Sequence, residues 1–216
     1  MKNLDGVTDI IGIIHVGANV GREVHRYETR GVKSVVWIEP IKTCFDALKK
    51  RVENCPTIES QVFNELISDV EGEELRFFEH YKSGVSSIYE LNTSSEQFHG
   101  RNLNTLKVRN QTVIKAITLR SLISQNNIDL DKFNCLVVDT QGSELKVFKG
   151  LKDDIKKFKY ICSEITEDNY NIYHNGCKFS ELNAYLNEFG FFHDEAECVF
   201  ESCKHRDIVY INKHEL

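Results

Sequence analysis

Residues 13–21 read Ile13-Ile14-His15-Val16-Gly17-Ala18-Asn19-Val20-Gly21, an apolar run too short for a helix that ends in a turn bounded by two glycines. This pattern predicts a first β-strand that leads into a cofactor-binding loop. Apolar side chains at helical spacing predict a helix over 20–30. A second apolar run, 35–38, stops at Glu39. Strand, glycine turn, helix, strand and acidic residue is the order of a nucleotide-binding βαβ unit, in which the acid accepts hydrogen bonds from both ribose hydroxyls.

The spacing of the glycines bears on which nucleotide would bind. A dinucleotide fingerprint needs a middle glycine so that the backbone can approach a pyrophosphate, and Asn19 stands at that position. A cofactor with a ribose but no phosphate, such as S-adenosylmethionine, needs only the tight turn that Gly17 and Gly21 supply. We favour that cofactor and keep three alternatives: a nicotinamide-dependent oxidoreductase, a non-catalytic binding module, and a plain strand-to-helix turn with Glu39 on the surface.

The composition predicts one α/β domain over residues 1–216. Of the 216 residues, 41% are hydrophobic and 28% are charged, which is enough for a sizeable core. The net charge is −6 and the basic residues are scattered, so we expect no nucleic-acid partner. Because the sequence has no apolar signal region and no run near ~18 apolar residues, we expect no membrane span and a cytoplasmic location. Nothing in the sequence indicates an oligomeric state.

The cysteines and the last residues predict no further site. Seven cysteines, an odd number without a C-x-x-C pair, are typical of free thiols in a reducing compartment. His193, Cys198, Cys203 and His205 lie close together in the sequence, but their spacing matches no zinc pattern, so we predict no metal. The terminal Lys-His-Glu-Leu resembles an endoplasmic-reticulum retrieval signal, which we interpret as a coincidence.

The middle of the chain contains a long polar segment between predicted strands. A helix is expected from Thr43 to Pro56, followed by strands over 59–67 and 73–78, and the main chain near Ile67 and Ser68 is expected to face an adenine. Residues 81–104 are rich in Ser, Asn and Gly and show no sustained period, and a loop of that length is usually functional or disordered. Strand structure follows over 106–117, and Thr118 is predicted to cap a short helix.

Two further predicted strands end in acidic residues. The buried apolar strand over 135–138 ends at Asp139, and the strand over 160–163 ends at Glu164. Open parallel sheets bind their ligands at the carboxyl ends of the strands. We therefore expect Asp139, Glu164 and Glu39 to lie at one edge of the sheet.

The last part of the chain predicts how the sheet ends. A strong helical stripe covers 179–189, and three strand-like runs follow at 191–193, 198–201 and 207–212 with no helix between them. The predicted fold class is therefore α/β, with a doubly wound, mostly parallel, Rossmann-like sheet that finishes in a C-terminal antiparallel hairpin. Class I methyltransferases have a sheet of this kind.

At this point the chain resembles the FkbM family of S-adenosylmethionine-dependent O-methyltransferases, over most of its length. The matching stretches are residues 15–21, Trp37-Ile38-Glu39, the Ser86-Ser87 pair, the run from Leu136 through Asp139-Thr140-Gln141-Gly142-Ser143-Glu144 to Gly150, and a later run from Glu164 to Cys177. The resemblance implies methyl transfer to a hydroxyl group of a sugar or a polyketide. The polar segment 81–104 favours a sugar or glycan, such as one containing a deoxyhexose like rhamnose or fucose, because saccharides are bound by polar side chains and an aromatic platform.

The sequence and the resemblance together yield a set of candidate site residues. The expected cofactor-binding residues are His15, Gly17, Ala18, Asn19, Gly21, Glu39, Ser68 and Asp139. Asp139 is the first choice for the general base and Glu164 the second, with His15 in reserve. Glu144 is a third catalytic candidate that would orient a neighbour or bind the acceptor. The expected acceptor-binding residues are Ser86, Ser87, Tyr89, Gln141 and Tyr173.

Overall fold

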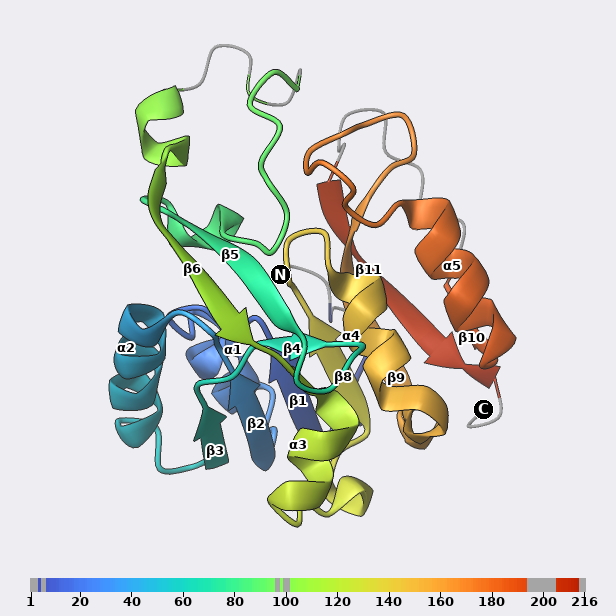
Figure 1. Ribbon diagram of the computed structural model, residues 1–216. Helices are drawn as coiled ribbons and strands as arrows, with labels where there is room; N and C mark the ends of the chain where they lie inside the picture. The colour runs from blue at the N-terminus through green and yellow to red at the C-terminus, as the bar shows by residue number, and fades with distance from the viewer. Residues whose placement is uncertain (1–3, 5–6, 96–97, 99–101, 194–204, 214–216) are drawn as a thin grey trace.

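The computed structural model describes residues 4, 7–95, 98, 102–193 and 205–213. Its main sheet has seven strands in the order β10-β11-β9-β8-β1-β2-β3 (Figure 1). The parallel strands are β1 (Gly12–Val16), β2 (Ser34–Ile38), β3 (Glu59–Phe63), β8 (Cys135–Val138) and β9 (Tyr160–Thr166). At one edge β11 (His205–Asn212) runs antiparallel to both β9 and β10 (Phe191–Phe192). This arrangement confirms the predicted fold class, while the strand predicted over 198–201 lies outside the described residues.

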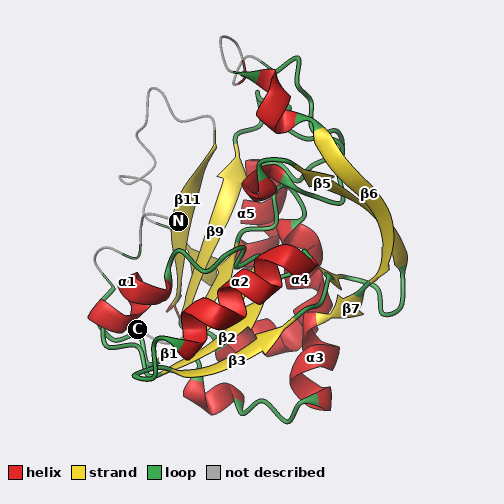
Figure 2. Ribbon diagram, turned by 90° about the vertical axis from the view of Figure 1, so that its left-hand side faces the viewer, coloured by secondary structure: helices red, strands yellow, loops and turns green. Residues whose placement is uncertain are grey.

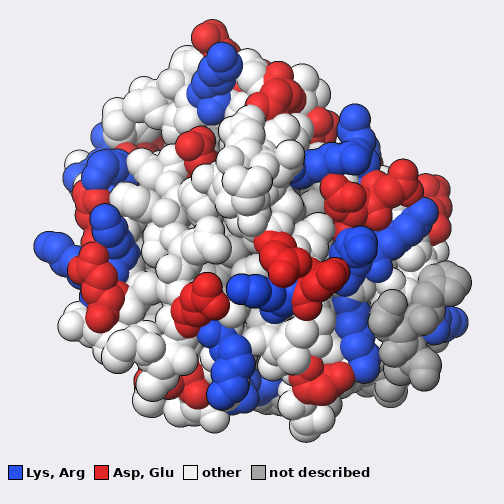
Figure 3. Space-filling model, turned by 90° about the horizontal axis from the view of Figure 1, so that it is seen from below, with Lys and Arg blue, Asp and Glu red and all other residues white. Residues whose placement is uncertain are grey.

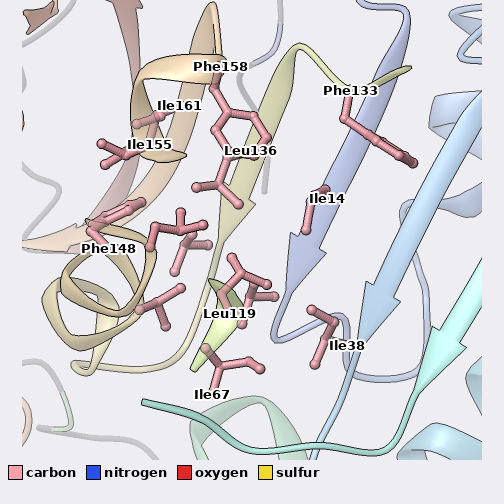
Figure 4. Close-up of a cluster of buried hydrophobic side chains, with 14 of the residues drawn as sticks. Ile14, Ile38, Ile67, Leu119, Phe133, Leu136, Phe148, Ile155, Phe158 and Ile161 are labelled. Atoms are coloured by element: carbon pink, nitrogen blue, oxygen red, sulfur yellow. The ribbon is translucent and has the colours of Figure 1, made fainter. Parts of the chain in front are cut away.

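Helices cover both faces of the sheet because the strand side chains alternate between two cores. One face carries α1 (Val24–Thr29) and α2 (Lys42–Glu53), and the other carries α3 (Leu119–Gln125), α4 (Glu144–Leu151) and α5 (Phe179–Glu188). In β1, Ile13 faces the first pair and Ile14 faces the other three. Figure 2 shows α1 and α2 in front of the sheet, and Figure 4 shows Ile14, Leu136 and Phe148 in the opposite core. None of these helices has the length and apolar character that a bilayer span requires, in the part of the chain that the structure describes.

A hairpin stands above the carboxyl edge of the sheet. It grows from a small parallel pair, β4 (Ile67–Ser68) and β7 (Ile117–Thr118), and consists of the antiparallel strands β5 (Glu74–His80) and β6 (Val108–Lys115). In Figure 1 it rises at the upper left, beyond the ends of β1 and β2. Four short 3-10 helices complete the described elements: Ser83–Val85, Leu103–Leu106, Leu130–Lys132 and Lys152–Lys157. The hairpin therefore forms one wall of the space at the carboxyl edge of the sheet.

Two predicted elements are shorter than expected, one because of its backbone conformation and the other because of local hydrogen bonds. The helix predicted over 20–30 begins only at Val24, since Asn19 and Gly21 have φ of 48° and 70°, which no helix accepts. The strand predicted over 59–67 ends at Phe63, where the side chain of Asn64 donates to the carbonyl oxygens of Glu39 and Pro40 at 2.8 and 2.9 Å. The chain then leaves the main sheet, and Ile67–Ser68 pairs with β7 instead.

The predicted strand over 106–117 is also divided. Ala116 lies between β6 and β7, and its N–H donates to the carbonyl oxygen of Glu73 at 2.8 Å, while the N–H of Gly72 donates to the carbonyl oxygen of Ala116 at 2.9 Å. The cap predicted at Thr118 is confirmed, because its side chain accepts a hydrogen bond from the N–H of Ser121 at 3.1 Å. The described part of the segment 81–104 contains short 3-10 turns and isolated β-bridges at Ser87 and Leu91. Val85, Leu91 and Phe98 are nevertheless buried against Ile172 and Tyr173.

Candidate active site

A cleft of about 590 Å³ opens at the carboxyl edge of the sheet. Its walls come from the ends of β1, β2 and β8, the approach to β4, the strand β5 and the segment after it. The lining residues are Val16, Gly17, Asn19, Glu39, Pro40, Ile41, Glu65, Leu66, Ile67, Phe77, Ser83, Gly84, Ser86, Ile88, Asp139, Thr140, Gln141 and Ser143. Carboxylates and amides thus lie beside an apolar floor, and such a mixture suits a ligand with both polar and apolar parts.

The first loop packs directly against the end of β8. Gly17 has φ of 85°, and a Cβ atom built on it would lie 1.9 Å from the carbonyl oxygen of Asp139. The N–H groups of Gly17 and Ala18 both donate to the carbonyl oxygen of Ile38, at 2.9 and 3.0 Å. Only glycine allows this approach, so the predicted cofactor loop and the predicted base are in backbone contact.

Glu39 is almost completely buried at the tip of β2. Its exposed fraction is 3%, and its two carboxylate oxygens accept hydrogen bonds from the N–H groups of Asn19 and Ile41, each at 2.8 Å. Burial raises the pKa of Glu39 to about 7, against the opposing effect of these two hydrogen bonds. The Asn19 side chain accepts a hydrogen bond from the Ser83 hydroxyl at 3.1 Å, which links this corner to the segment after β5.

Four of the predicted cofactor residues do not line the cleft: His15, Ala18, Gly21 and Ser68. His15 is buried on the sheet face that carries α1, with its Nδ1 atom 3.1 Å from the Tyr27 hydroxyl and its ring 5.5 Å from that of Trp37. Burial lowers the pKa of His15 to about 3, so its imidazole is neutral. The Ser68 hydroxyl donates to Asp69 at 3.1 Å, and a Cβ atom on Gly150 would lie 2.5 Å from the Ser68 carbonyl oxygen. Its neighbour Ile67 lines the cleft instead.

Asp139, directly after β8, and Glu164, within β9, bring two carboxyl groups together. The strand predicted to end at Glu164 continues to Thr166, because residues 164–166 stay paired with β11. Asp139 and Glu164 are joined by a side-chain hydrogen bond. The amide nitrogen of Gln141 donates to Asp139 at 2.6 Å and also to Glu164. Burial, followed by the charge of Glu164, raises the pKa of Asp139 well above its usual range, and burial raises the pKa of Glu164 to about 8. The two groups therefore titrate as a pair.

Glu144 shapes the loop that precedes α4. Its carboxylate accepts hydrogen bonds from the N–H groups of Thr140 and Gly142, at 2.9 and 3.0 Å, and it is 3% exposed. Its oxygens are thus engaged by its own loop, as expected of a residue that orients its neighbours. The loop that it holds contains Gln141.

The serines of the polar segment are engaged by protein groups. The Ser86 hydroxyl accepts from the N–H of His80 at 3.0 Å, and the Ser87 hydroxyl donates to the carbonyl oxygen of Gln141 at 2.7 Å. Ser86 lines the cleft, and Ser87 is 1% exposed. Ser86 therefore ties the polar segment to β5, and Ser87 ties it to the loop after β8.

Tyr89 lies in a second groove, next to the cleft. This groove is lined by Asp69, Tyr89, Gly142, Ser143, Leu145, Lys146, Lys149, Asn175, Cys177 and Glu181, and it shares Ser143 with the cleft. Inside it Lys146 forms an ion pair with Asp69 at 2.7 Å. Tyr173, the last predicted acceptor residue, is buried, and its hydroxyl donates to the Gln141 side chain at 2.7 Å.

Several cleft residues could not be found from the sequence. Phe77, Ser83 and Ile88 reach the cleft only because the β5–β6 hairpin folds over the carboxyl edge. Thr140, which directly follows the predicted base, had a local signal because it belongs to the turn into α4. Glu65 and Leu66 follow the break after β3, which the sequence pattern did not reveal.

One protein family and two solved structures are similar to this chain. The family described as "Methyltransferase FkbM domain" matches residues 15–192. A candidate tRNA (m1A22) methyltransferase from Streptococcus pneumoniae has a similar structure, with 10% identity and a TM-score of 0.48 over 96% of this chain and 66% of that one. The methyltransferase domain of bacterial CtHen1 matches with 9% identity and a TM-score of 0.44 over 94% and 90% of the two chains. This chain thus spans just under two thirds of the first of these structures. The curated proteins include no match.

The order of the strands and the cleft at their carboxyl ends define a class I methyltransferase fold. With a family match across residues 15–192, the chain belongs to the FkbM methyltransferase domain family, as the sequence motifs predicted. Methyltransferases of this family generally use S-adenosylmethionine. The residues present fit that cofactor, because a buried carboxylate at the tip of β2 lies in the same cleft as the glycine loop and an apolar floor.

Proposed function

We propose that this protein is an S-adenosylmethionine-dependent O-methyltransferase that acts on a hydroxyl group of a sugar or glycan. The observation that carries this proposal is the cleft itself, which joins Gly17, Asn19 and Glu39 on one side to Asp139 on the other. A ribose-binding acid and a proton acceptor therefore line one cavity. Separate sites would not support a transfer reaction, since the methyl donor and the acceptor must meet.

The proposed cofactor residues follow from the geometry of the cleft. Glu39 would accept hydrogen bonds from the ribose hydroxyls, because each of its oxygens already accepts one backbone N–H and retains capacity for another. The backbone around Gly17, with Ala18 and Asn19, would face the amino-acid tail, and Leu66 and Ile67 would contact the adenine. Gly21 contributes the second bend of the loop.

The proposed chemistry assigns different roles to the donor and to the protein. S-adenosylmethionine supplies an electrophilic methyl carbon, whose bond to sulfur breaks as its bond to the acceptor oxygen forms. The protein must align the hydroxyl group and take up its proton. Asp139 and Glu164 are the proton acceptors at the edge of the sheet, and Glu144 orients the loop between them. A positive charge in the cleft lowers the pKa values of both carboxyl groups and favours the ionised form that can accept a proton.

The proposed acceptor is a saccharide. The second groove offers Tyr89 as an aromatic platform, with Asp69, Lys146 and Asn175 as polar partners, and it meets the cleft at Ser143. A polyketide would need a broader apolar surface than this groove provides. A net charge of −6 argues against a nucleic-acid acceptor. Basic and acidic side chains are interspersed on the face seen from below in Figure 3. A deoxyhexose acceptor and a cytoplasmic location stay predictions.

The test begins with calorimetric titration of S-adenosylmethionine, S-adenosylhomocysteine and NAD into the protein. We expect the first two to bind and NAD not to bind. Binding of NAD alone would support an oxidoreductase, and binding of none would support a non-catalytic module. Transfer of tritium from [methyl-³H]S-adenosylmethionine to a panel of methyl glycosides, including rhamnosides and fucosides, then tests the acceptor class. Labelling of polyketide hydroxyls with unlabelled sugars would contradict the saccharide assignment.

A further inference from the structure

Gln141 is fully occupied by contacts with protein groups, although it lines the cleft. Its amide nitrogen donates to Asp139 and to Glu164, and its amide oxygen accepts from the Tyr173 hydroxyl at 2.7 Å. Both N–H bonds of the amide are thereby used. The Tyr173 hydroxyl holds the oxygen of this amide. The amide nitrogen is thereby directed toward Asp139 and Glu164.

Tyr173 supplies that donor from outside the sheet. It is 2% exposed, and besides Gln141 its hydroxyl contacts the carbonyl oxygen of Val85 at 3.2 Å. A β-bridge between Leu91 and Tyr173 ties it to the polar segment. The side chain is therefore fixed by packing and hydrogen bonds, which is what a residue that positions another must have.

The backbone of Gln141 is held in a strained conformation. It has φ of 58°, in the left-handed region that non-glycine residues rarely adopt. Strain of this kind persists only where the surroundings impose it. Here the Ser87 hydroxyl holds the Gln141 carbonyl oxygen at 2.7 Å, and Glu144 holds the N–H groups on either side. Ser87 and Glu144 thus fix the backbone around Gln141, while its side-chain amide is fixed by the three contacts described above.

We propose that Gln141 and Tyr173 are positioning residues that hold Asp139 and Glu164 together as a single proton-accepting pair at the methyl-transfer site. This inference rests on the proposed function for its chemistry and on the hydrogen bonds for its geometry. Gln141 donates to both carboxyl groups, so it stabilises the pair once one proton has left. The acceptor proton then moves to the pair, whose remaining proton lies between the two groups.

The charged groups around the pair come from three further elements. Asp207 on β11 is the register partner of Glu164, and its charge raises the pKa of both carboxyl groups. Glu144 on α4 raises the pKa of Glu164, and the charge of Asp139 raises the pKa of Glu39 on β2. All of these neighbours are acidic. In contrast to these acidic neighbours, the amide N–H groups of Gln141 lower the pKa of Asp139 and favour its ionised form.

The test is a pH titration of the side-chain carboxyl carbons by ¹³C NMR in the full-length protein labelled at Asp and Glu. Asp139→Asn and Glu164→Gln assign the two signals. We expect both wild-type signals to respond to a common titration above pH 7. Loss of a hydrogen bond to the ionised form raises a carboxyl pKa, so Gln141→Leu should move the midpoint up by about one pH unit and Tyr173→Phe by roughly half of that.

Tyr185→Phe is the matched control, since it also removes one tyrosine hydroxyl, which contacts the Phe148 carbonyl oxygen at 3.4 Å away from the cleft. It should leave the titration unchanged. Wild-type signals that titrate independently near pH 4, or an unchanged midpoint in folded Tyr173→Phe, would overturn the inference. If Gln141→Leu fails to fold, the titration midpoint of Tyr173→Phe alone tests the inference.

A second readout separates this inference from the proposed function. Tyr173→Phe should bind S-adenosylhomocysteine within twofold of the wild type, and the pH at which methyl transfer is half-maximal should rise by the same amount as the carboxyl midpoint. If the wild type does not bind S-adenosylmethionine at all, the proposed function fails, and the carboxyl titration still decides whether the pair exists. A rate that falls equally at every pH would indicate a structural role only and contradict the inference.

Discussion

The two halves of the sheet edge hold their acidic residues in different ways. At the end of β2, Glu39 is fixed by backbone N–H groups of its own neighbourhood, at Asn19 and Ile41. In the other half, Asp139 after β8 and Glu164 within β9 are fixed by each other and by the side chain of Gln141. Backbone N–H groups hold the carboxylate oxygens of Glu39 in fixed positions. Asp139 and Glu164, in contrast, are two carboxyl groups that can share a proton. The difference supports our proposal that the first half binds the cofactor and the second accepts the proton.

The largest expected effect is on the rate of methyl transfer, through substitution of Asp139. Asp139→Asn removes the proton acceptor while retaining the shape of the side chain, and loss of a general base costs ~10²–10⁴-fold in rate. Single-turnover transfer from labelled S-adenosylmethionine to the acceptor found in the glycoside panel measures this loss. Asp153→Asn, an exposed carboxylate far from the cleft, is the control and should retain the wild-type rate. A full rate in Asp139→Asn would move the base to Glu164, with Glu164→Gln as the next variant.

Substitution of Glu39 should change the affinity for S-adenosylmethionine. Glu39→Ala removes two hydrogen bonds from the ribose hydroxyls to a charged acceptor, a loss on the order of 3 kcal/mol, or about a hundredfold in affinity. Calorimetry with S-adenosylmethionine measures it. Because the substitution also leaves the N–H groups of Asn19 and Ile41 without their partner, Glu39→Gln and a thermal unfolding curve are needed as controls. Unchanged affinity in Glu39→Ala would remove the reason for the ribose assignment.

The contrast between the halves also explains what the sequence could predict. The glycine loop, Glu39 and the order of the strands depend on contacts within a short βαβ unit, and they follow from periodicity and turn residues. The pair of Asp139 and Glu164 was expected at one edge, because strand tips converge in a parallel sheet. Its arrangement around Gln141 was not expected, since it requires contacts among residues 85–87, 139–141, 164 and 173. The core position of His15 likewise depends on Tyr27 and Trp37, which pack from two other elements.

The pH dependence of cofactor affinity sharpens the comparison further. The pKa of Glu39 is about 7, and only its ionised form accepts hydrogen bonds from both ribose hydroxyls. As the pH falls below that value the carboxyl group is protonated, so affinity should fall by up to about tenfold per pH unit. Titrations of S-adenosylhomocysteine between pH 8 and 5 measure this slope. Glu39→Gln should be flat over the same range, and an equal slope in both proteins would show that another group is responsible.

The smallest expected effect concerns the polar segment that covers both halves. Its first residues contact each half, through Ser83 to Asn19 and through Ser87 to Gln141. If the segment 81–104 acts as a lid or acceptor platform, we expect its hydrogen exchange to slow when cofactor and acceptor are both bound. Strand β11, at the far edge of the sheet, serves as the internal control. A segment as protected as β8 without any ligand would rule out a lid.

The most direct test of the division is the affinity for S-adenosylhomocysteine in Glu39→Ala and Asp139→Asn, measured side by side by calorimetry at pH 8. This ligand lacks the sulfonium charge, so a change of charge at Asp139 has little direct effect on its binding. We expect about a hundredfold weaker binding for Glu39→Ala and a change of less than threefold, roughly 0.6 kcal/mol, for Asp139→Asn. Equal losses in the two variants, or a larger loss in Asp139→Asn, would contradict the assignment of binding to one half of the edge and proton transfer to the other.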